Sequence, residues 1–196
     1  MNKLFISLII LTALLSSNCY SQSEKAILFF NDGDSIPGYA FIKNNKIKFR
    51  VSLESKADFW SFDMVKKVEF ETLFRIITYE YVKLNESDDP LLIELVTKGE
   101  VSFYRQTSSS WILDSNFPGN NFPNNRKVTN VSNYLVRKND DYPSCLNCGL
   151  FNKWKKRTMD FLIDCPVLVK KIKTNEFREI HLQEIVEYYN DYCTEL

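Results

Sequence analysis

Apolar and polar residues alternate in short runs through the first half of the chain, and this period of two is typical of antiparallel strands. In KIKFRVS, for example, Ile47, Phe49 and Val51 fall on one face and Lys48 falls on the other. Clusters rich in Asn, Asp and Gly end these runs at intervals of roughly 8–12 residues. Residues 22–138 are therefore predicted to form a β-rich module, an antiparallel barrel or roll of about seven or eight strands.

One stretch inside this module, residues 107–130, has a different composition. Ser, Asn, Pro and Gly dominate it, so it is predicted to be a long loop. Loops longer than about 12–15 residues are often functional, and Trp111, Phe117 and Phe122 are spaced through this one as candidates for a contact surface. The alternative is a mobile connection without a binding role.

Residues 139–196 change to the helical period. One helix is predicted from about Gly149 to Ile163, a second with Pro166 in its first turn, and a third from about Arg178. The apolar stripes of the second and third helices are expected to face the core: Cys165, Leu168, Val169 and Ile172, then Leu182, Ile185, Val186, Tyr189, Tyr192 and Cys193. The predicted fold class is thus α+β, a β-rich module followed by a three-helix segment packed on it.

The N-terminus has the order of a secretory signal peptide. Lys3 precedes an apolar run from Leu4 to Leu15, and a small, polar segment follows, so residues 1–21 are predicted to be removed on export. The run is shorter than the roughly 20 residues of a membrane span. The alternatives are a retained anchor helix and lipidation of Cys19, which Asn18 disfavours because lipoprotein signals carry a small residue there. A periplasmic or secreted protein is expected.

Composition and charge exclude several classes of protein. The chain is 44% hydrophobic and 26% charged, which is ordinary for a globular protein and argues against a disordered one. Its 25 basic and 25 acidic side chains balance, so no global field favours nucleic acid. The sequence has no Gly-rich phosphate loop, and no cofactor is expected. After the predicted signal peptide no apolar run approaches membrane length, and the oligomeric state is left open.

Four cysteines follow the predicted signal peptide, and in an exported protein an even number favours disulfides. Cys165 with Cys193 is the preferred pair, because both are expected to point inward from neighbouring helices. This bond would close a loop of about 27 residues and stabilise the fold by roughly 3 kcal/mol. Cys145 and Cys148 would then form a local bridge or remain as thiols.

The Cys-x-x-Cys spacing of Cys145 and Cys148 raises two other possibilities. Both sulfurs fall near a predicted helix start, where a thiolate is stabilised, so a thiol–disulfide oxidoreductase is an alternative function. A thioredoxin-like enzyme needs a βαβ setting, however, and an antiparallel region precedes this pair. A structural zinc site needs a second close pair of ligands; Cys165 and Cys193 lie far apart, and His181 is the only histidine. No metal is expected.

A basic cluster and the titratable residues complete the candidate chemistry. Four basic residues of the first predicted helix are candidates for binding an anion or a partner protein: Lys153, Lys155, Lys156 and Arg157. The alternative is a solvated helix flank whose lysine stems cover Trp154. No catalytic residue is predicted, because His181 lacks a partner nucleophile in the sequence pattern. A pair of carboxylates across a cleft is left open.

Several segments together resemble a family of exported Bacteroidota proteins of unknown activity. DGDSIPGYAFIKNNKIKFR and LLIELVTKGEVSFYR are similar to the family's hairpins, with Phe103-Tyr104 in place of its Leu-Tyr. FWSFDMVKKVEFE is similar to a further segment, without the family's proline and glycine, and FLIDCPVLVKKI and IVEYYNDYC are similar to its closing helices. The resemblance covers nearly the whole mature chain and implies a β-rich front, a helical tail and export. The Cys-x-x-Cys lies outside the family pattern.

These observations favour an exported, non-enzymatic binding or interaction module of the bacterial cell envelope, whose partner is a protein or an envelope component. The alternatives are a periplasmic thiol–disulfide oxidoreductase that uses Cys145 and Cys148, and a structural accessory of an outer-membrane assembly.

Overall fold

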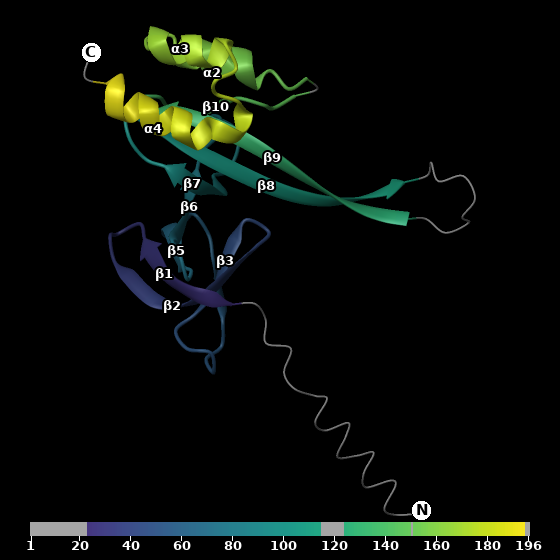
Figure 1. The fold of residues 1–196 in the computed structure, drawn as a ribbon. Coiled ribbons are helices and arrows are strands. Elements are labelled where there is room, and N and C mark those ends of the chain that lie inside the picture. Colours follow the sequence, from purple (N-terminus) through teal and green to yellow (C-terminus); the bar gives the residue numbers. More distant parts are fainter. Residues whose placement is uncertain (1–22, 115–123, 150, 195–196) are drawn as a thin grey trace, which may run out of the picture.

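The computed structural model describes residues 23–114, 124–149 and 151–194 (Figure 1), so the predicted signal peptide with Cys19 lies outside the described residues. Ten strands form one antiparallel sheet in the order β10-β9-β8-β7-β6-β5-β1-β2-β3-β4. Their bounds are β1 (Glu24–Phe30), β2 (Ser35–Lys43), β3 (Lys46–Arg50), β4 (Asp58–Trp60), β5 (Val65–Glu71), β6 (Ile76–Val82), β7 (Leu91–Thr97), β8 (Val101–Asp114), β9 (Asn124–Arg137) and β10 (Ser144–Cys145). The sheet is open, with β4 and β10 at its edges, so a closed barrel of seven or eight strands is wrong.

The N-terminal half of the sheet curls over a core of its own. Ile47 and Phe49 are buried as predicted, with Leu28 and Val68 beside them, whereas Val51 follows the end of β3 and is 61% exposed. The two-residue turn between β2 and β3 stabilises this curvature, because the Asn45 side chain forms hydrogen bonds with the start of β7. Leu92 N–H donates to Asn45 Oδ1 (2.7 Å), and Asn45 Nδ2 donates to the carbonyl of Pro90 (2.9 Å). The predicted antiparallel β-rich module is thus confirmed, and its sheet is curved but not closed.

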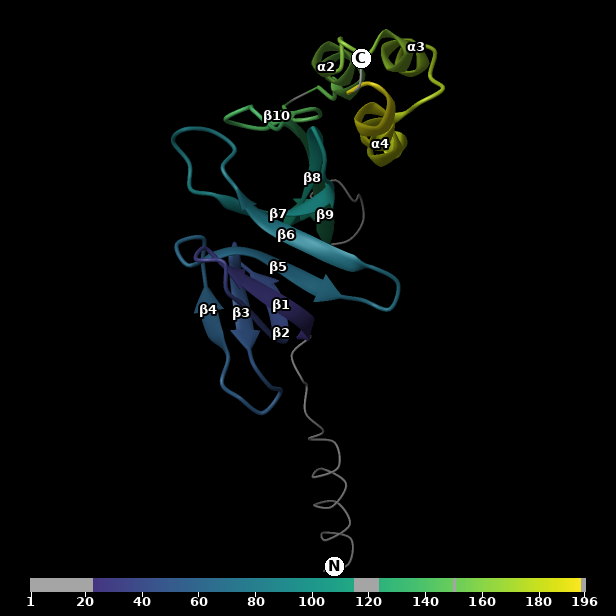
Figure 2. The ribbon, with the colours of Figure 1, turned by 90° about the vertical axis from the view of Figure 1, so that its left-hand side faces the viewer.

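Three α-helices and a short 3-10 helix follow the sheet and cover one face of β8 and β9 (Figure 2). They are α2 (Trp154–Phe161), α3 (Pro166–Lys173), η1 (Glu179–His181) and α4 (Leu182–Tyr192). The core between sheet and helices contains most of the two predicted stripes: Cys165, Leu168, Ile172, Leu182, Ile185, Val186 and Tyr189. Tyr192 is 65% exposed, contrary to the prediction, because it lies on the outer flank of α4 beside Tyr188. The first helix is shorter than predicted and leaves Phe151 73% exposed.

The predicted loop over residues 107–130 is wrong. β8 and β9 pair without interruption from Val101 opposite Arg137 to Asp114 opposite Asn124, so strand structure covers residues 107–114 and 124–130. Serine, threonine and asparagine stand across from one another in this pairing, and such pairs stabilise adjacent strands by hydrogen bonding. A polar strand lacks the apolar alternation by which the other strands were recognised, which is why the sequence indicated a loop.

Within the described residues, no helix has both the length and the apolar character needed to cross a membrane.

Candidate functional site

The long β8–β9 hairpin projects beyond the rest of the sheet (Figure 1). β7 pairs with β8 only over Phe103–Arg105, and β10 pairs with β9 only at Tyr134 and Leu135. We call the two-stranded part formed by residues 107–114 and 124–130 the ribbon, and the rest of the described chain the body. In the described structure each strand of the ribbon pairs only with the other, so both outer backbone edges are open.

The ribbon is polar along the part whose side chains are described. Thr107 to Ser110 are exposed on β8, as are Lys127, Thr129 and Asn130 on β9. Asn147 marks where the body ends, because its Nδ2 donates to the Val131 carbonyl (3.0 Å) and covers that edge of β9. A two-stranded hairpin is marginally stable in water, so the body gains little from this extension. Open strand edges are the usual place at which a strand of another chain adds to a sheet.

The aromatic contact residues predicted for this region are not described by the structure. Trp111 falls in β8 opposite Lys127, and its side chain is outside the described part of the chain. Phe117 and Phe122 belong to residues 115–123, which are also outside it.

The Cys-x-x-Cys forms a disulfide in a loop beside the sheet rather than at a helix N-terminus. Cys145 ends β10 and lies opposite Tyr134, and α2 begins only at Trp154. Cys148 N–H donates to Cys145 Sγ (3.1 Å). The guanidinium of Arg157 donates to the Cys145 carbonyl (3.3 Å) and the Cys148 carbonyl (2.8 Å). Both sulfurs are half-buried, and a positive charge holds the loop that carries them.

The four basic residues of the predicted cluster do not share one surface. Lys153 and Lys156 are exposed, whereas Lys155 Nζ donates to Asn175 Oδ1 (2.6 Å) and the Lys173 carbonyl (3.1 Å). Arg157 is turned onto the Cys-x-x-Cys loop. The helix pattern placed these residues on the same stretch of chain, but hydrogen bonds to other segments engage two of them, Lys155 and Arg157.

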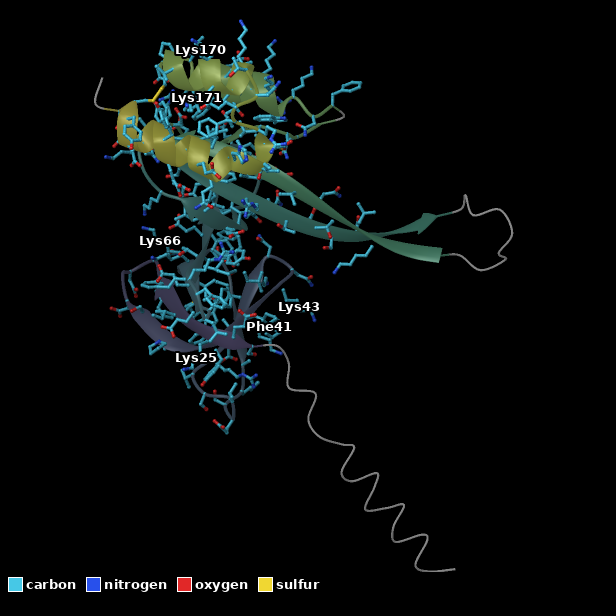
Figure 3. The ribbon with its side chains drawn as sticks, viewed as in Figure 1. Lys25, Phe41, Lys43, Lys66, Lys170 and Lys171 are labelled. Carbon is cyan, nitrogen blue, oxygen red and sulfur yellow. A yellow bond between two sulfur atoms is a disulfide. The ribbon has the colours of Figure 1, made fainter. Side chains whose placement is uncertain are left out.

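The second disulfide joins Cys165 to Cys193, the pairing that the sequence predicts (Figure 3, yellow bond). Cys165 is the residue before α3, and Cys193 follows α4, so the bond connects the start of one helix to the end of the other. Cys165 is buried, and its position in the helix–sheet core gives the bond a structural role.

A cluster around Arg137 connects the sheet to the helices and was not found from the sequence. Arg137 Nη1 donates to Tyr189 Oη (2.6 Å), and its Nη2 donates to the Phe161 carbonyl (2.7 Å) and to Asp164 Oδ1 (3.0 Å). Tyr189 Oη donates to Asp164 Oδ2 (2.6 Å). These groups line a cleft of about 350 Å³ with Glu100 and Asp140. Because the guanidinium is bonded to α2, to α4 and to the connection between α2 and α3, the cluster is a structural connection.

This cluster changes the pKa of its acid. Partial burial alone would raise the pKa of Asp164, but the hydrogen bonds from Arg137 and Tyr189 and the charge of Arg137 hold it below the ordinary value. A carboxylate with a lowered pKa in the folded state stabilises the fold above its unfolded pKa of about 3.9, and this stabilisation is lost as pH falls through the folded pKa.

Asp164→Asn should therefore weaken the pH dependence of stability in acid. Below pH ~4 the free energy of unfolding of the parent is expected to fall by up to about 1 kcal/mol, and that of the variant should not show this fall. The difference is small because the Asp164 side chain is 49% exposed. Urea unfolding across an acidic pH series measures the difference. Asp160→Asn, at an exposed position of α2, is the control and should follow the parent.

Among the described residues, no group of three or more His, Cys, Asp or Glu side chains is placed to hold a metal ion. His181 Nδ1 accepts the backbone N–H of Arg178 (3.4 Å) at the start of η1, a local capping contact. Asp140 likewise accepts the backbone N–H of Arg137 (3.0 Å) in the turn after β9.

No protein-family model, curated protein or solved structure matches this chain. The resemblance to exported Bacteroidota proteins therefore stays a prediction. What the structure defines is an α+β protein with an open ten-stranded antiparallel sheet, a projecting ribbon and two disulfides.

Proposed function

We propose that this chain is an exported binding module of the bacterial cell envelope and that the ribbon is its contact element. The observation that carries the proposal is the pair of open backbone edges on a hairpin that extends away from its own sheet (Figure 1). The two disulfides are compatible with an oxidising compartment, and the N-terminal pattern predicts export.

The partner that fits the ribbon is an extended polypeptide segment that adds as a further strand. Strand addition draws its affinity from backbone hydrogen bonds, and the open edges of the ribbon supply them. The exposed serines and threonines are small and uncharged, so they let another backbone approach closely.

Photo-crosslinking in the producing cells tests this proposal. A photoreactive amino acid in place of Ser108, on the ribbon, should crosslink to a partner protein, whereas the same amino acid in place of Glu184, on the exposed side of α4, should not. Equal crosslinking from both positions, or none from Ser108, would contradict the ribbon as contact element.

Shortening the ribbon separates binding from folding. Ser108 and Asn130 are partners in the strand register, so replacing residues 109–129 with Asn-Gly should close the hairpin with a two-residue turn. We expect both disulfides to form and the Tm to stay within roughly 3 °C of the parent, because an isolated two-stranded extension adds little stability. The partner crosslinked by the full-length ribbon should no longer be retained in a pull-down with the shortened chain.

Thiol–disulfide exchange at Cys145 and Cys148 is a second candidate function. The N–H of Cys148 and the charge of Arg157 both favour a thiolate at Cys145, and stabilising the reduced form makes a disulfide easier to reduce. In the exchange, the Cys145 thiolate attacks a substrate disulfide and forms a mixed disulfide, and the leaving substrate thiolate takes up a proton. The Cys148 thiolate then attacks Cys145 Sγ, which releases the second substrate thiolate and restores the Cys145–Cys148 bond. An external dithiol reduces this bond for the next cycle.

A glutathione redox series tests the second candidate with a control inside the same chain. Cys145–Cys148 should be reduced at a glutathione ratio at which Cys165–Cys193 remains oxidised, as shown by differential alkylation and peptide mass spectrometry. Arg157→Met should make Cys145–Cys148 harder to reduce, since the variant removes the positive charge. Reduction of both disulfides at the same ratio, or failure of the chain to reduce insulin in the presence of a dithiol, would exclude the exchange function.

A further inference from the structure

The turn between β5 and β6 exposes two adjacent large apolar side chains almost completely. Leu73 is 94% exposed and Phe74 is 96% exposed. Ile76, the first residue of β6, is 63% exposed, and Val51, just after β3, is 61% exposed. We call these four residues the apolar end. Side chains so far from the three hydrophobic cores contribute almost nothing to holding the fold together, and clustered exposed apolar residues mark interaction sites.

The apolar end is continuous along the surface. Leu73 and Phe74 line a groove of about 650 Å³ together with Lys25 and Glu71. The neighbouring groove contains Val51 and shares both Lys25 and Glu71 with the first. Two loops and the start of β1 thus meet in one surface region, although they are far apart along the chain.

This region is where the chain enters the body. Glu24, the first residue of β1, lines the same groove as Leu73 and Phe74, and Arg50 Nη2 donates to Ser23 Oγ (3.0 Å) beside it. In Figure 3, Lys25 lies at the opposite end of the molecule from Lys170 and Lys171 on α3. The apolar end therefore lies beside the start of β1, next to the point at which the N-terminal segment joins the described chain.

We propose that the apolar end inserts into a lipid surface. The segment that joins the body here carries the apolar run Leu4 to Leu15, which the sequence directs to a membrane during export. From Leu15 to Ser23 the chain advances by eight residues, so it reaches at most about 28 Å between that run and β1. While the N-terminal segment is attached, the apolar end therefore lies beside the point at which that segment joins the described chain, within this reach of a bilayer that binds the apolar run.

The shape and charge of the apolar end fit a bilayer better than a protein pocket. Leu73 and Phe74 stand in the turn of the β5–β6 hairpin and are almost fully exposed, and side chains presented in this way need a deep complementary pocket in a protein but enter the interfacial region of a lipid layer directly. Two acidic and two basic side chains surround the tip: Glu24, Glu71, Lys25 and Arg75. Because these charges balance, insertion should depend on apolar contact rather than on anionic lipids.

Vesicle flotation with the chain from residue 22 onward, which contains every described strand and helix, tests the proposal. It should float with phosphatidylcholine vesicles as well as with mixed phosphatidylethanolamine–phosphatidylglycerol vesicles, and added salt should not release it. Leu73→Ser with Phe74→Ser should lower the partition coefficient roughly 100-fold, since two large side chains would no longer be buried in lipid. In a Phe74→Trp variant, tryptophan emission should shift to the blue when vesicles are added.

The matched control removes two equally apolar residues from the helical end. Phe151 is 73% exposed and Ile180 is 76% exposed, so Phe151→Ser with Ile180→Ser removes comparable exposed surface without touching the apolar end. The control variant should float like the parent. The proposal is overturned if the parent does not float, if the control loses as much as the Leu73/Phe74 variant, or if light scattering shows that Leu73 and Phe74 instead hold two copies of the chain together.

Discussion

Replacing Cys165 and Cys193 together with serine should lower the free energy of unfolding by about 3–4 kcal/mol and the Tm by roughly 10 °C. The bond spans 28 residues of sequence, so its removal restores much conformational freedom to the unfolded chain. The serine at position 165 would also place a hydroxyl in the buried core between the helices and the sheet.

The other disulfide supplies the control for this measurement. Cys145 and Cys148 are three residues apart, and in the same chain-entropy treatment removing their bond costs only about 2 kcal/mol. Urea and thermal unfolding of the two double-serine variants should therefore rank them in the order of loop length. A larger loss for the Cys145/Cys148 variant would show that the disulfide in the loop bound by Arg157 contributes more to stability than the disulfide that joins α3 to α4.

Phe103→Ala is expected to cost about 3–5 kcal/mol, because it empties a large volume at the centre of the main core. Phe103 is 1% exposed on β8 and lies under the helices, opposite Leu135 in the sheet register. The surrounding side chains come from both the sheet and the helices, so neither layer can close the cavity without moving the other. Chemical unfolding monitored by circular dichroism measures the loss.

Phe151→Ala removes the same group from a site that is 73% exposed and should change stability by about 0.5 kcal/mol or less. Should Phe103→Ala fail to fold, Phe103→Leu keeps most of the volume and should cost less than the alanine variant. A Phe103→Leu variant as stable as the parent would show that the helices do not depend on this contact.

The sequence predicted those parts of the fold in which burial follows a regular period. Leu168 and Ile172 on α3 and Ile185 on α4 were found because one apolar stripe faces one core. The curled strands were found for the same reason, since Ile47 and Phe49 alternate with charged residues. Closure of the sheet was not predictable, because it depends on how far the strands twist and on which strands lie at the edges.

The candidate sites were harder to predict, since each depends on distant segments or on polar pairing. The ribbon has hydroxyl and amide side chains on both strands, so its residues look like loop residues until the two strands are aligned. Arg137 meets Asp164 and Tyr189, which are 27 and 52 residues further along the chain, and no local pattern connects them. Leu73 and Phe74 resemble core residues in sequence, and only the turn geometry shows that they face outward.

The position of β1 has a consequence for how the chain folds as it is synthesised. β1 is the first strand to emerge, yet it lies inside the sheet, with β2 on one side and β5 on the other. β2 follows at once and closes one side through a short hairpin. The backbone on the other side of β1 has no strand partner until Val65–Glu71 has been synthesised, and during that interval pairing with another nascent chain competes with folding. The interval before the chain has been made as far as Glu71 is therefore the stage at which this protein is most exposed to misassembly.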